Sequence, residues 1–234
     1  MGAKGGVRRG LLITVEGVEG SGKTTQCARL AKRLREAGHR VLETREPGGT
    51  PLAERIRSLF LGTATDTDRA EAITPECEAL LVFACRSQHI SQVIEPAIGE
   101  GAIVLCDRFV DSTLAYQGYG RGLDIKTLRA LNRFVTKGLA PALTLLFDLP
   151  AQIGLARRRR KDLELNRLDR EAKQFHERVR RGFLALAVQE PRRVKVLDAR
   201  ADPDQVEAAA WTLVQRLLVR RPAKPAKRAA QKSR

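Results

Sequence analysis

Short apolar segments alternate with longer stretches of helical periodicity along most of the chain. The apolar segments are typical of buried strands and cover residues 11–15, 40–44, 102–106, 143–147 and 194–197. Apolar residues recur at helical spacing over residues 24–37, 51–61, 76–94, 124–136, 151–161, 168–189 and 204–219. This repeated order predicts an α/β fold with a five-stranded, mostly parallel sheet and helices on both faces, in three layers.

The loop after the first strand carries the clearest motif. Residues 17–24 read GVEGSGKT and match the pattern G-x-x-x-x-G-K-[ST] between a strand and a helix. Glycines let backbone N–H groups close around a phosphate, while the lysine reaches the β- and γ-phosphates and the threonine holds Mg²⁺. The pattern predicts a nucleoside triphosphate site formed by Gly17, Glu19, Gly20, Ser21, Gly22, Lys23, Thr24 and Thr25.

The strand at 102–106 leads into Asp107 and Arg108. A carboxylate at the end of a buried strand suits the Mg²⁺ shell beside a phosphate loop, so Asp107 joins Thr24 as a candidate metal ligand. The planar guanidinium of Arg108 is suited to clamping a phosphate. Because ligands of parallel sheets bind beyond the carboxyl ends of the strands, both side chains are expected near the phosphate loop.

Several classes of phosphate-binding protein do not fit. The guanine-reading motif N-K-x-D is absent, which argues against a GTPase, and the chain is short for a motor or transporter ATPase. Arginines follow more than one predicted strand. Such cations, together with Mg²⁺, offset the repulsion between two phosphorylated molecules, so the pattern favours a kinase of a small phosphorylated acceptor.

The composition is that of one globular domain, or of two small ones at most. The chain has 234 residues, 43% of them hydrophobic, and only four cysteines, none in a C-x-x-C pair. We expect the cysteines to be buried in a reducing cytosol, and the three histidines lie at no metal-ligand spacing. The longest uncharged run, residues 138–147, is short of the roughly 18 residues that a membrane span needs. No apolar region of signal-peptide type follows the basic start, so we expect a cytoplasmic protein.

The net charge of +16 is concentrated at the two ends. Ten lysines and arginines lie in residues 1–10 and 220–234, which contain no acid, so the body carries only +6. We predict a flexible basic N-terminus at 1–10, a phosphate-loop kinase domain at 11–219 and a disordered basic tail at 220–234. An alternative for the tail is an arm that contacts nucleic acid weakly.

Taken together, these motifs resemble the thymidylate kinase family over residues 11–218. The matching segments are GVEGSGKTT at 17–25, TREPGGT at 44–50, EALLVFACRSQH at 78–89, DRFVDSTLAYQG at 107–118, GRG at 120–122 and VLDA at 196–199. The resemblance implies a phosphate-loop kinase fold, transfer of the γ-phosphoryl group of ATP to dTMP, a requirement for Mg²⁺, and a homodimer.

The resemblance also implies roles for individual residues. Arg45 and Arg108 would hold the acceptor phosphate, and Pro47 would help to wall the base. Tyr116 and Gln117 would lie over the sugar, where the tyrosine ring rejects a 2′-hydroxyl, with Ser112 and Thr113 near the base edge. By the same analogy, Glu19 would contact the acceptor side or a water of the metal.

Two departures from the family pattern concern the base and the lid. The family places a base-stacking phenylalanine four residues before the base-reading arginine, here Arg86, but that position is Val82 and the aromatic is Phe83. Since both share a helix face with Arg86, Phe83 is kept as the stacking candidate. The phosphate loop lacks an arginine, so the resemblance predicts a lid at about 150–168 with catalytic arginines Arg157, Arg158, Arg159 and Arg160.

Two other functions stay open at this level. One is a related kinase that acts on another nucleotide or on a nucleoside. The other is a nucleic-acid-binding ATPase, which the basic ends suggest.

Overall fold

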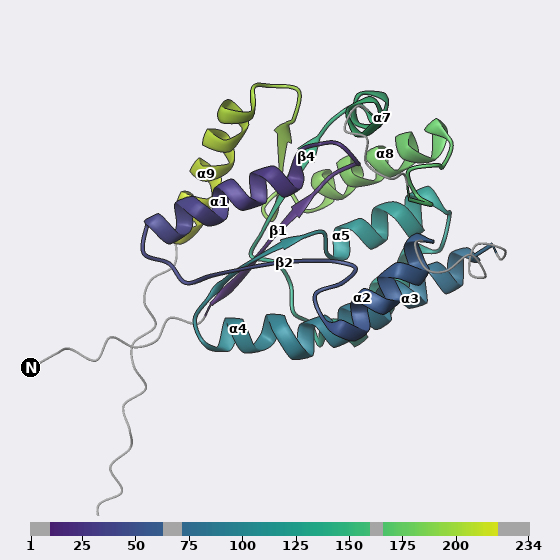
Figure 1. Ribbon diagram of the computed structural model, residues 1–234, viewed down its shortest axis with the longest axis horizontal. Helices are drawn as coiled ribbons and strands as arrows, with labels where there is room; N and C mark the ends of the chain where they lie inside the picture. The colour runs from purple at the N-terminus through teal and green to yellow at the C-terminus, as the bar shows by residue number, and fades with distance from the viewer. Residues whose placement is uncertain (1–9, 63–71, 160–165, 220–234) are drawn as a thin grey trace, which may run out of the picture.

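The computed structural model describes residues 10–62, 72–159 and 166–219. Within these residues one sheet (Figure 1) contains β1 (Leu11–Glu16), β2 (Val41–Arg45), β3 (Ile103–Asp107), β4 (Leu143–Asp148) and β5 (Val194–Asp198). The strand order is β2-β3-β1-β4-β5, and every neighbouring pair is parallel. The predicted five-stranded parallel sheet is therefore confirmed.

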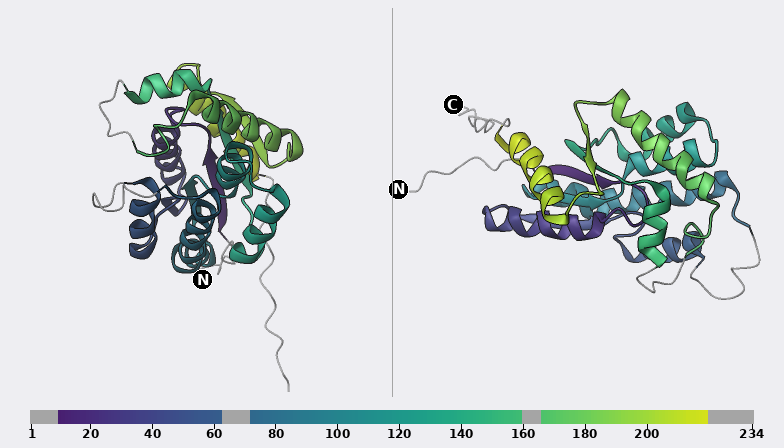
Figure 2. Two further views of the ribbon diagram at one scale, coloured as in Figure 1. Left: turned by 90° about the vertical axis from the view of Figure 1, so that its right-hand side faces the viewer. Right: turned by 90° about the horizontal axis from the view of Figure 1, so that it is seen from above.

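Helices cover both faces of this sheet (Figure 2). They are α1 (Lys23–Glu36), α2 (Pro51–Leu61), α3 (Pro75–His89), α4 (Glu95–Gly99), α5 (Val110–Thr113), α6 (Ile125–Thr136), α7 (Ala151–Arg159), α8 (Lys173–Gln189) and α9 (Pro203–Val219), with π-helical turns η2 (Ile90–Ile94) and η3 (Leu114–Gly120). No helix in the described ranges combines the length and the apolar character that a bilayer crossing requires.

Alternate residues of the central strands enter two separate cores. Ile13 of β1 packs with Leu30 of α1, whereas its neighbour Leu12 packs with Ile98 of α4. Both faces are apolar because a parallel sheet is covered on both sides. Cys27 and Cys106 also lie in these cores, but Cys77 is exposed, contrary to the expectation for all four cysteines.

Polar side chains mark the beginnings of several helices. The hydroxyl of Thr50 accepts from Ala53 N, that of Thr74 accepts from Cys77 N, and the carboxylate of Asp124 accepts from Thr127 N. These caps satisfy N–H groups that have no partner within the helix. The predicted helix at 51–61 accordingly coincides with α2.

Two predicted helices have different bounds. The stretch 76–94 is not one regular helix, because α3 ends at His89 and passes into η2 and then α4. The helix predicted at 168–189 begins only at Lys173. Its expected first turn is replaced by a loop in which Asn166 Oδ1 accepts from the backbone N–H groups of Leu168 and Asp169. Local side-chain bonds of this kind compete with a regular helix.

The helical segment Val110–Gly120, comprising α5 and η3, was not predicted. Amphipathic periodicity could not reveal it because the segment is buried on nearly every side, at polar as well as apolar positions. Ser112, Thr113 and Gln117 are all buried there, beside Leu114 and Tyr116. A segment that hides polar side chains in this way needs specific partners for them.

One such partner is a buried ion pair that fastens α5 to the sheet. Arg193, just before β5, donates to both carboxylate oxygens of Asp111, at 2.7 and 2.8 Å, and to the hydroxyl of Thr144 in β4. The side chain of Asp111 is 2% exposed. A charge so deeply buried is tolerated only while its partner is present.

We therefore expect Arg193→Ala to lower the free energy of unfolding by about 3 to 5 kcal/mol, because it leaves the Asp111 carboxylate buried and unpaired. Urea denaturation of the purified variant measures this change. Arg40→Ala is the control, since it removes a solvent-exposed pair with Glu100 and should cost at most about 1 kcal/mol. Equal losses in the two variants would contradict the assigned role of Arg193.

Candidate active site

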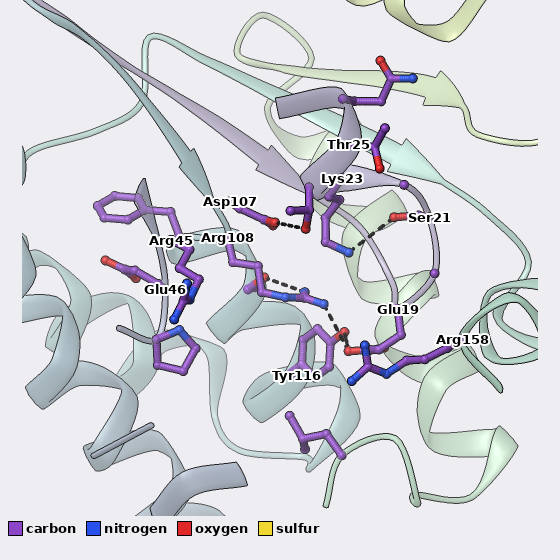
Figure 3. Close-up of a pocket in the computed structure, with 18 of the residues that line it drawn as sticks. Glu19, Ser21, Lys23, Thr25, Arg45, Glu46, Asp107, Arg108, Tyr116 and Arg158 are labelled. Carbon is purple, nitrogen blue, oxygen red and sulfur yellow. Dashed lines mark hydrogen bonds and ion pairs between the residues drawn. The ribbon is translucent and has the colours of Figure 1, made fainter. Parts of the chain in front are cut away.

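The carboxyl ends of three neighbouring strands open into one cavity of about 950 Å³. The sheet order places β1 beside β3 and β3 beside β2, so the loop after β1, Asp107 and Arg45 are brought together although they are far apart in sequence. Figure 3 shows Lys23, Arg108, Glu19 and Tyr116 converging on this space. A cavity of this size at strand ends is where parallel sheets bind ligands.

The phosphate loop, residues 17–24, joins β1 to α1. Gly22 adopts φ +84° at the helix N-cap, a backbone conformation that other residues rarely take. All residues from Glu19 to Thr25 line the cavity, whereas Gly17 does not, and its carbonyl instead accepts from Arg108 Nη1 at 3.1 Å. Residues 19–25 of the predicted phosphate site thus surround one cavity.

Lys23 is buried in this loop, and its ammonium donates to Val18 O at 2.7 Å. Burial, and then the nearby charge of Arg108, lower the pKa of Lys23 to about 8. The next residue, Thr24, donates from its hydroxyl to Asp107 Oδ2 at 2.8 Å. The pair Thr24 and Asp107 therefore offers hydroxyl and carboxylate oxygens side by side, next to a cation.

Arg108 occupies the centre of the cavity wall and is held by several partners. It donates to Gly17 O, to Ser112 Oγ at 3.2 Å and to Glu19 Oε1 at 3.1 Å, and it lies over the Tyr116 ring at 5.0 Å. Its φ of +69° turns the chain sharply at the end of β3. Although burial opposes its charge, Tyr116 and Glu19 hold the pKa of Arg108 above its ordinary value. It is a fixed, permanently charged group.

Glu19 supplies the counter-charge. One of its oxygens accepts from Arg108 and from the Tyr116 hydroxyl, and the other lies 3.4 Å from His176 Nδ1. Burial alone would raise the pKa of Glu19, but these hydrogen bonds and the charges of Arg108 and Lys23 lower it well below the usual range. Glu19 therefore faces the cations Arg108 and Lys23, and its contact with the acceptor side or with a water of the metal stays a prediction.

Arg45 and Pro47 lie at the outer side of the same cavity. The side chain of Arg45 is about half exposed and is paired with Glu54 at 3.0 Å. A third arginine, Arg57 of α2, also lines the cavity and donates to Pro47 O at 2.7 Å. Burial, and then the neighbouring Arg45, lower the pKa of Arg57, as expected for a cation facing like charges.

The inner wall comes from α3, α5 and η3. Val82, Arg86, Ser112, Thr113, Tyr116 and Gln117 all line the cavity. Phe83, the predicted stacking residue, does not, because its ring packs with Leu114, Leu128 and Leu186. One residue of helix turns a side chain by about 100°, so the aromatic faces the core and Val82 faces the cavity in its place.

Arg86 is 1% exposed and is rigidly tethered. It donates to Glu46 Oε2 at 2.8 Å, to Phe109 O at 3.0 Å and to Thr113 Oγ1 at 2.9 Å. Glu46 in turn lies 3.2 Å from His89 Nδ1. These acceptors compensate the buried charge of the guanidinium, and Arg86 also lines the cavity.

The predicted lid arginines are divided by the structure. Arg157 and Arg158 line the cavity, Arg159 does not, and Arg160 lies outside the described residues. Arg157 Nη1 donates to Ala199 O at 3.1 Å, and Arg158 Nε lies 2.5 Å from Asp169 Oδ1. The basic ends, residues 1–9 and 220–234, are also outside the described residues.

The sequence reasoning missed two residues of this site. Arg57 lies within the correctly predicted helix at 51–61, and its position belongs to no motif. His176 is buried on α8 beside Glu19, but a single histidine on an amphipathic helix gives no signal. Only the folded arrangement brings either residue to the cavity.

Comparisons of the sequence and of the structure with known proteins identify the same family. A sequence model of the family described as thymidylate kinase matches residues 15–210. Thymidylate kinase of Thermomicrobium roseum is 53% identical over 208 residues, which are 89% of this chain and 96% of that protein. That of Geobacter sulfurreducens is 49% identical over 218 residues, 91% of this chain and 99% of that protein.

A solved structure is also similar. The crystal structure of thymidylate kinase from Ehrlichia chaffeensis superposes with a TM-score of 0.70 at 34% sequence identity. The match covers 88% of this chain and 98% of that one.

The buried Glu16 at the end of β1 makes stability depend on pH. Its carboxylate accepts from Phe109 N at 2.7 Å and from the Ser112 hydroxyl, yet burial, and then the nearby Asp111, raise the pKa of Glu16 to about 7. The native state therefore binds more protons than the unfolded state from about pH 4.5 to 7, and the contribution to stability falls as the pH rises through this window.

We expect wild type to lose on the order of 3 kcal/mol of unfolding free energy relative to Glu16→Gln between pH 4.5 and 7. The glutamine keeps the size and the hydrogen-bonding oxygen but does not titrate. Urea denaturation at a series of pH values measures the difference. Parallel pH profiles for the two proteins would show that Glu16 titrates in its ordinary range.

Proposed function

The chain belongs to the thymidylate kinase family, and from this premise we propose how its residues divide the work of transfer. The reaction moves a phosphoryl group from ATP to dTMP and so serves the synthesis of dTTP. Two anionic nucleotides must then meet end to end in the cavity of about 950 Å³. The observation that carries the assignment is that Lys23, Arg57 and Arg108 all face this one cavity from three different elements.

The donor, ATP, is assigned to the phosphate loop. Backbone N–H groups of residues 20–25 at the start of α1 would surround its phosphates, and the partial positive charge of the helix N-terminus favours them there. Lys23 would exchange its bond to Val18 O for a phosphate oxygen. The arriving negative charge raises the pKa of Lys23 and so keeps it protonated.

Mg²⁺ is assigned to Thr24 and Asp107. Their oxygens lie 2.8 Å apart and are the hard donors that Mg²⁺ prefers. The described residues contain no cluster of three or more acidic, histidine or cysteine side chains that would form a complete metal cage. This fits an ion that keeps waters and takes phosphate oxygens as its other ligands. When bound, Mg²⁺ neutralises charge on the β- and γ-phosphates.

The acceptor, dTMP, is assigned to the opposite side of the cavity. Arg108 and Arg57 are partly buried and placed to hold its phosphate, with Arg45 at the rim. Arg86 and Thr113 would face the base, together with Pro47 and Ser112. The base would rest on Val82, since Phe83 is turned into the core.

Tyr116 and Gln117 are assigned to the sugar. The Tyr116 ring is held from two sides, by its hydroxyl bond to Glu19 and by Arg108 over its face. Gln117 donates to Glu78 at 2.7 Å, which fixes its orientation. A ring held this firmly cannot move aside for a 2′-hydroxyl, which favours a deoxyribose.

Arg157 and Arg158 are assigned to the transferring phosphoryl group. They would close over it and exclude water, so that the acceptor phosphate oxygen attacks the γ-phosphorus directly. No side chain needs to act as a nucleophile. The protein supplies position and charge, which are the main contributions to phosphoryl transfer.

We also propose that the protein works as a cytoplasmic homodimer. Leu52 and Leu59 of α2, Leu80 of α3 and Phe134 of α6 are exposed, and Phe134 is 82% accessible. Because α3 contacts both α2 and α6, these residues lie on adjoining helices that a second copy would cover. The free cysteines fit a reducing compartment. The basic ends suit a weak contact with nucleic acid that the transfer does not need.

Two alanine variants separate the two ends of the site. We expect Arg108→Ala to raise the KM for dTMP and to lower kcat, since its contact with the acceptor phosphate is made in the ground state and becomes stronger in the transition state. Lys23→Ala should lower kcat/KM for ATP by on the order of 100-fold or more, because charge develops on the donor phosphates. Steady-state kinetics with each substrate varied measure both, and Lys32→Ala, on the exposed face of α1, is the control.

If Arg108→Ala changed only the KM for ATP, the acceptor assignment would be wrong. A wild-type preference for another nucleoside monophosphate over dTMP would contradict the assignment of the residues that face the base.

For the dimer, Phe134→Asp should shift the protein from dimer to monomer in sedimentation equilibrium, because a charge cannot be buried unpaired at an interface. Val219→Asp is the matched control. Val219 is also exposed, at 85%, but lies at the end of α9 on the other face of the sheet. A monomeric wild type would refute the proposal.

A further inference from the structure

Helix α7 rests directly on the backbone of the phosphate loop. A Cβ atom added at Gly154 would lie 2.1 Å from Glu19 O, and one added at Gly20 would lie 2.1 Å from Gly154 O. Real Cβ atoms do not approach within 3.0 Å of such atoms. Two glycines therefore face each other because neither position has room for a side chain.

The contacted peptide group has a second side that faces the cavity. The peptide between Glu19 and Gly20 is trans, so its N–H points away from its carbonyl. Its carbonyl faces α7, and Gly20 lines the cavity. Within the described ranges, the Gly20 N–H donates to no protein acceptor. One side of this peptide supports the helix, and the other side is turned toward the proposed donor phosphates.

The face of α7 that makes this contact is the face that carries the lid arginines. Residues three and four apart lie on one side of a helix, so Gly154 shares its face with Arg157 and Arg158. Both arginines line the cavity, whereas Arg159, on another face, does not. The depth at which Gly154 rests on the loop therefore decides where the two guanidinium groups lie.

We propose that Gly154 is a positioning residue for phosphoryl transfer. Its missing side chain lets α7 approach the phosphate loop closely enough for Arg157 and Arg158 to reach the transferring group. This inference rests on the assignment of those arginines under the proposed function.

An alanine at position 154 would have to move one of the two backbones by about 1 Å. The backbone of the loop is fixed at both ends, by β1 and by α1. Near this point α7 is attached through two long side chains, Arg157 on Ala199 O and Arg158 on Asp169, which can bend. We therefore expect the helix to move rather than the loop. A displacement of about 1 Å at a catalytic group can reduce the rate on the order of 100-fold.

The test compares three glycine-to-alanine variants of the full chain. Gly154→Ala carries the proposed clash. Gly10→Ala carries an equivalent clash, with its Cβ 2.0 Å from Ala102 O, but at the start of β1, the opposite end of the sheet from the site. Gly99→Ala, in α4, meets no heavy atom within 4 Å.

We expect Gly154→Ala to lower kcat by about 10-fold to 100-fold, with the KM for dTMP within about twofold of wild type, since the acceptor contacts do not involve α7. Gly10→Ala should lower Tm without this loss of kcat, and Gly99→Ala should leave both unchanged. A kcat of Gly154→Ala equal to that of Gly10→Ala would overturn the inference.

Arg158→Ala distinguishes the two levels of the argument. If Arg158→Ala keeps full kcat, the assignment of the lid arginine itself is wrong. If Arg158→Ala loses activity while Gly154→Ala does not, only the role of Gly154 is refuted.

A measurement on wild type covers the case in which Gly154→Ala does not fold. With ¹⁵N-glycine labelling, the amide signals of Gly20 and Gly154 should both move when ADP is added, while those of Gly10 and Gly99 should not. A Gly154 signal that stays fixed while Gly20 moves would overturn the coupling.

Discussion

The site depends on holding several cations in one partly buried cavity before any phosphate arrives. Lys23, Arg57 and Arg108 repel one another and have lost hydration, and the lowered pKa values of Lys23 and Arg57 reflect this. Glu19 offsets the repulsion at its centre, where it accepts from Arg108 and Tyr116. The structure can therefore keep its positive charges in place without a bound nucleotide, so little rearrangement is needed when one binds.

Further buried carboxylates fix the side chains around this cavity. Glu46 holds Arg86, and Glu78, which is fully buried, accepts from Gln117, Arg121 and Arg167. Burial opposes ionisation of Glu78, but the bonds from Arg121 and Gln117 lower its pKa. Arg167 follows α7, the helix of the predicted lid, in sequence. Through Arg167 and Gln117, Glu78 therefore links the segment after α7 to a residue assigned to the sugar. Groups that never touch a nucleotide thus determine where the contacting ones lie.

The sequence was sufficient to predict the sheet, most helices and the phosphate loop. The strands and helices follow from the periodicity of apolar residues, and the loop follows from the spacing of its glycines, lysine and threonine. It was insufficient where burial depends on the tertiary fold. The segment Val110–Gly120 has no amphipathic pattern because it is covered all round, and Phe83 could be separated from Val82 only by knowing which face of α3 meets the core. Arg57 and His176 reach the site through packing of distant elements, which no local pattern records. The family resemblance supplied the acceptor residues, and the structure now gives their geometry.

The pKa of about 8 for Lys23 has a thermodynamic consequence for nucleotide capture. Near that pH, part of the population carries a neutral amine, and the incoming anion restores its charge by drawing a fraction of a proton from the buffer. The heat of binding measured by calorimetry should then vary with the ionisation enthalpy of the buffer. Association of nucleotide with this protein is in this sense also a proton-uptake reaction, and its apparent affinity weakens as the solution becomes more alkaline.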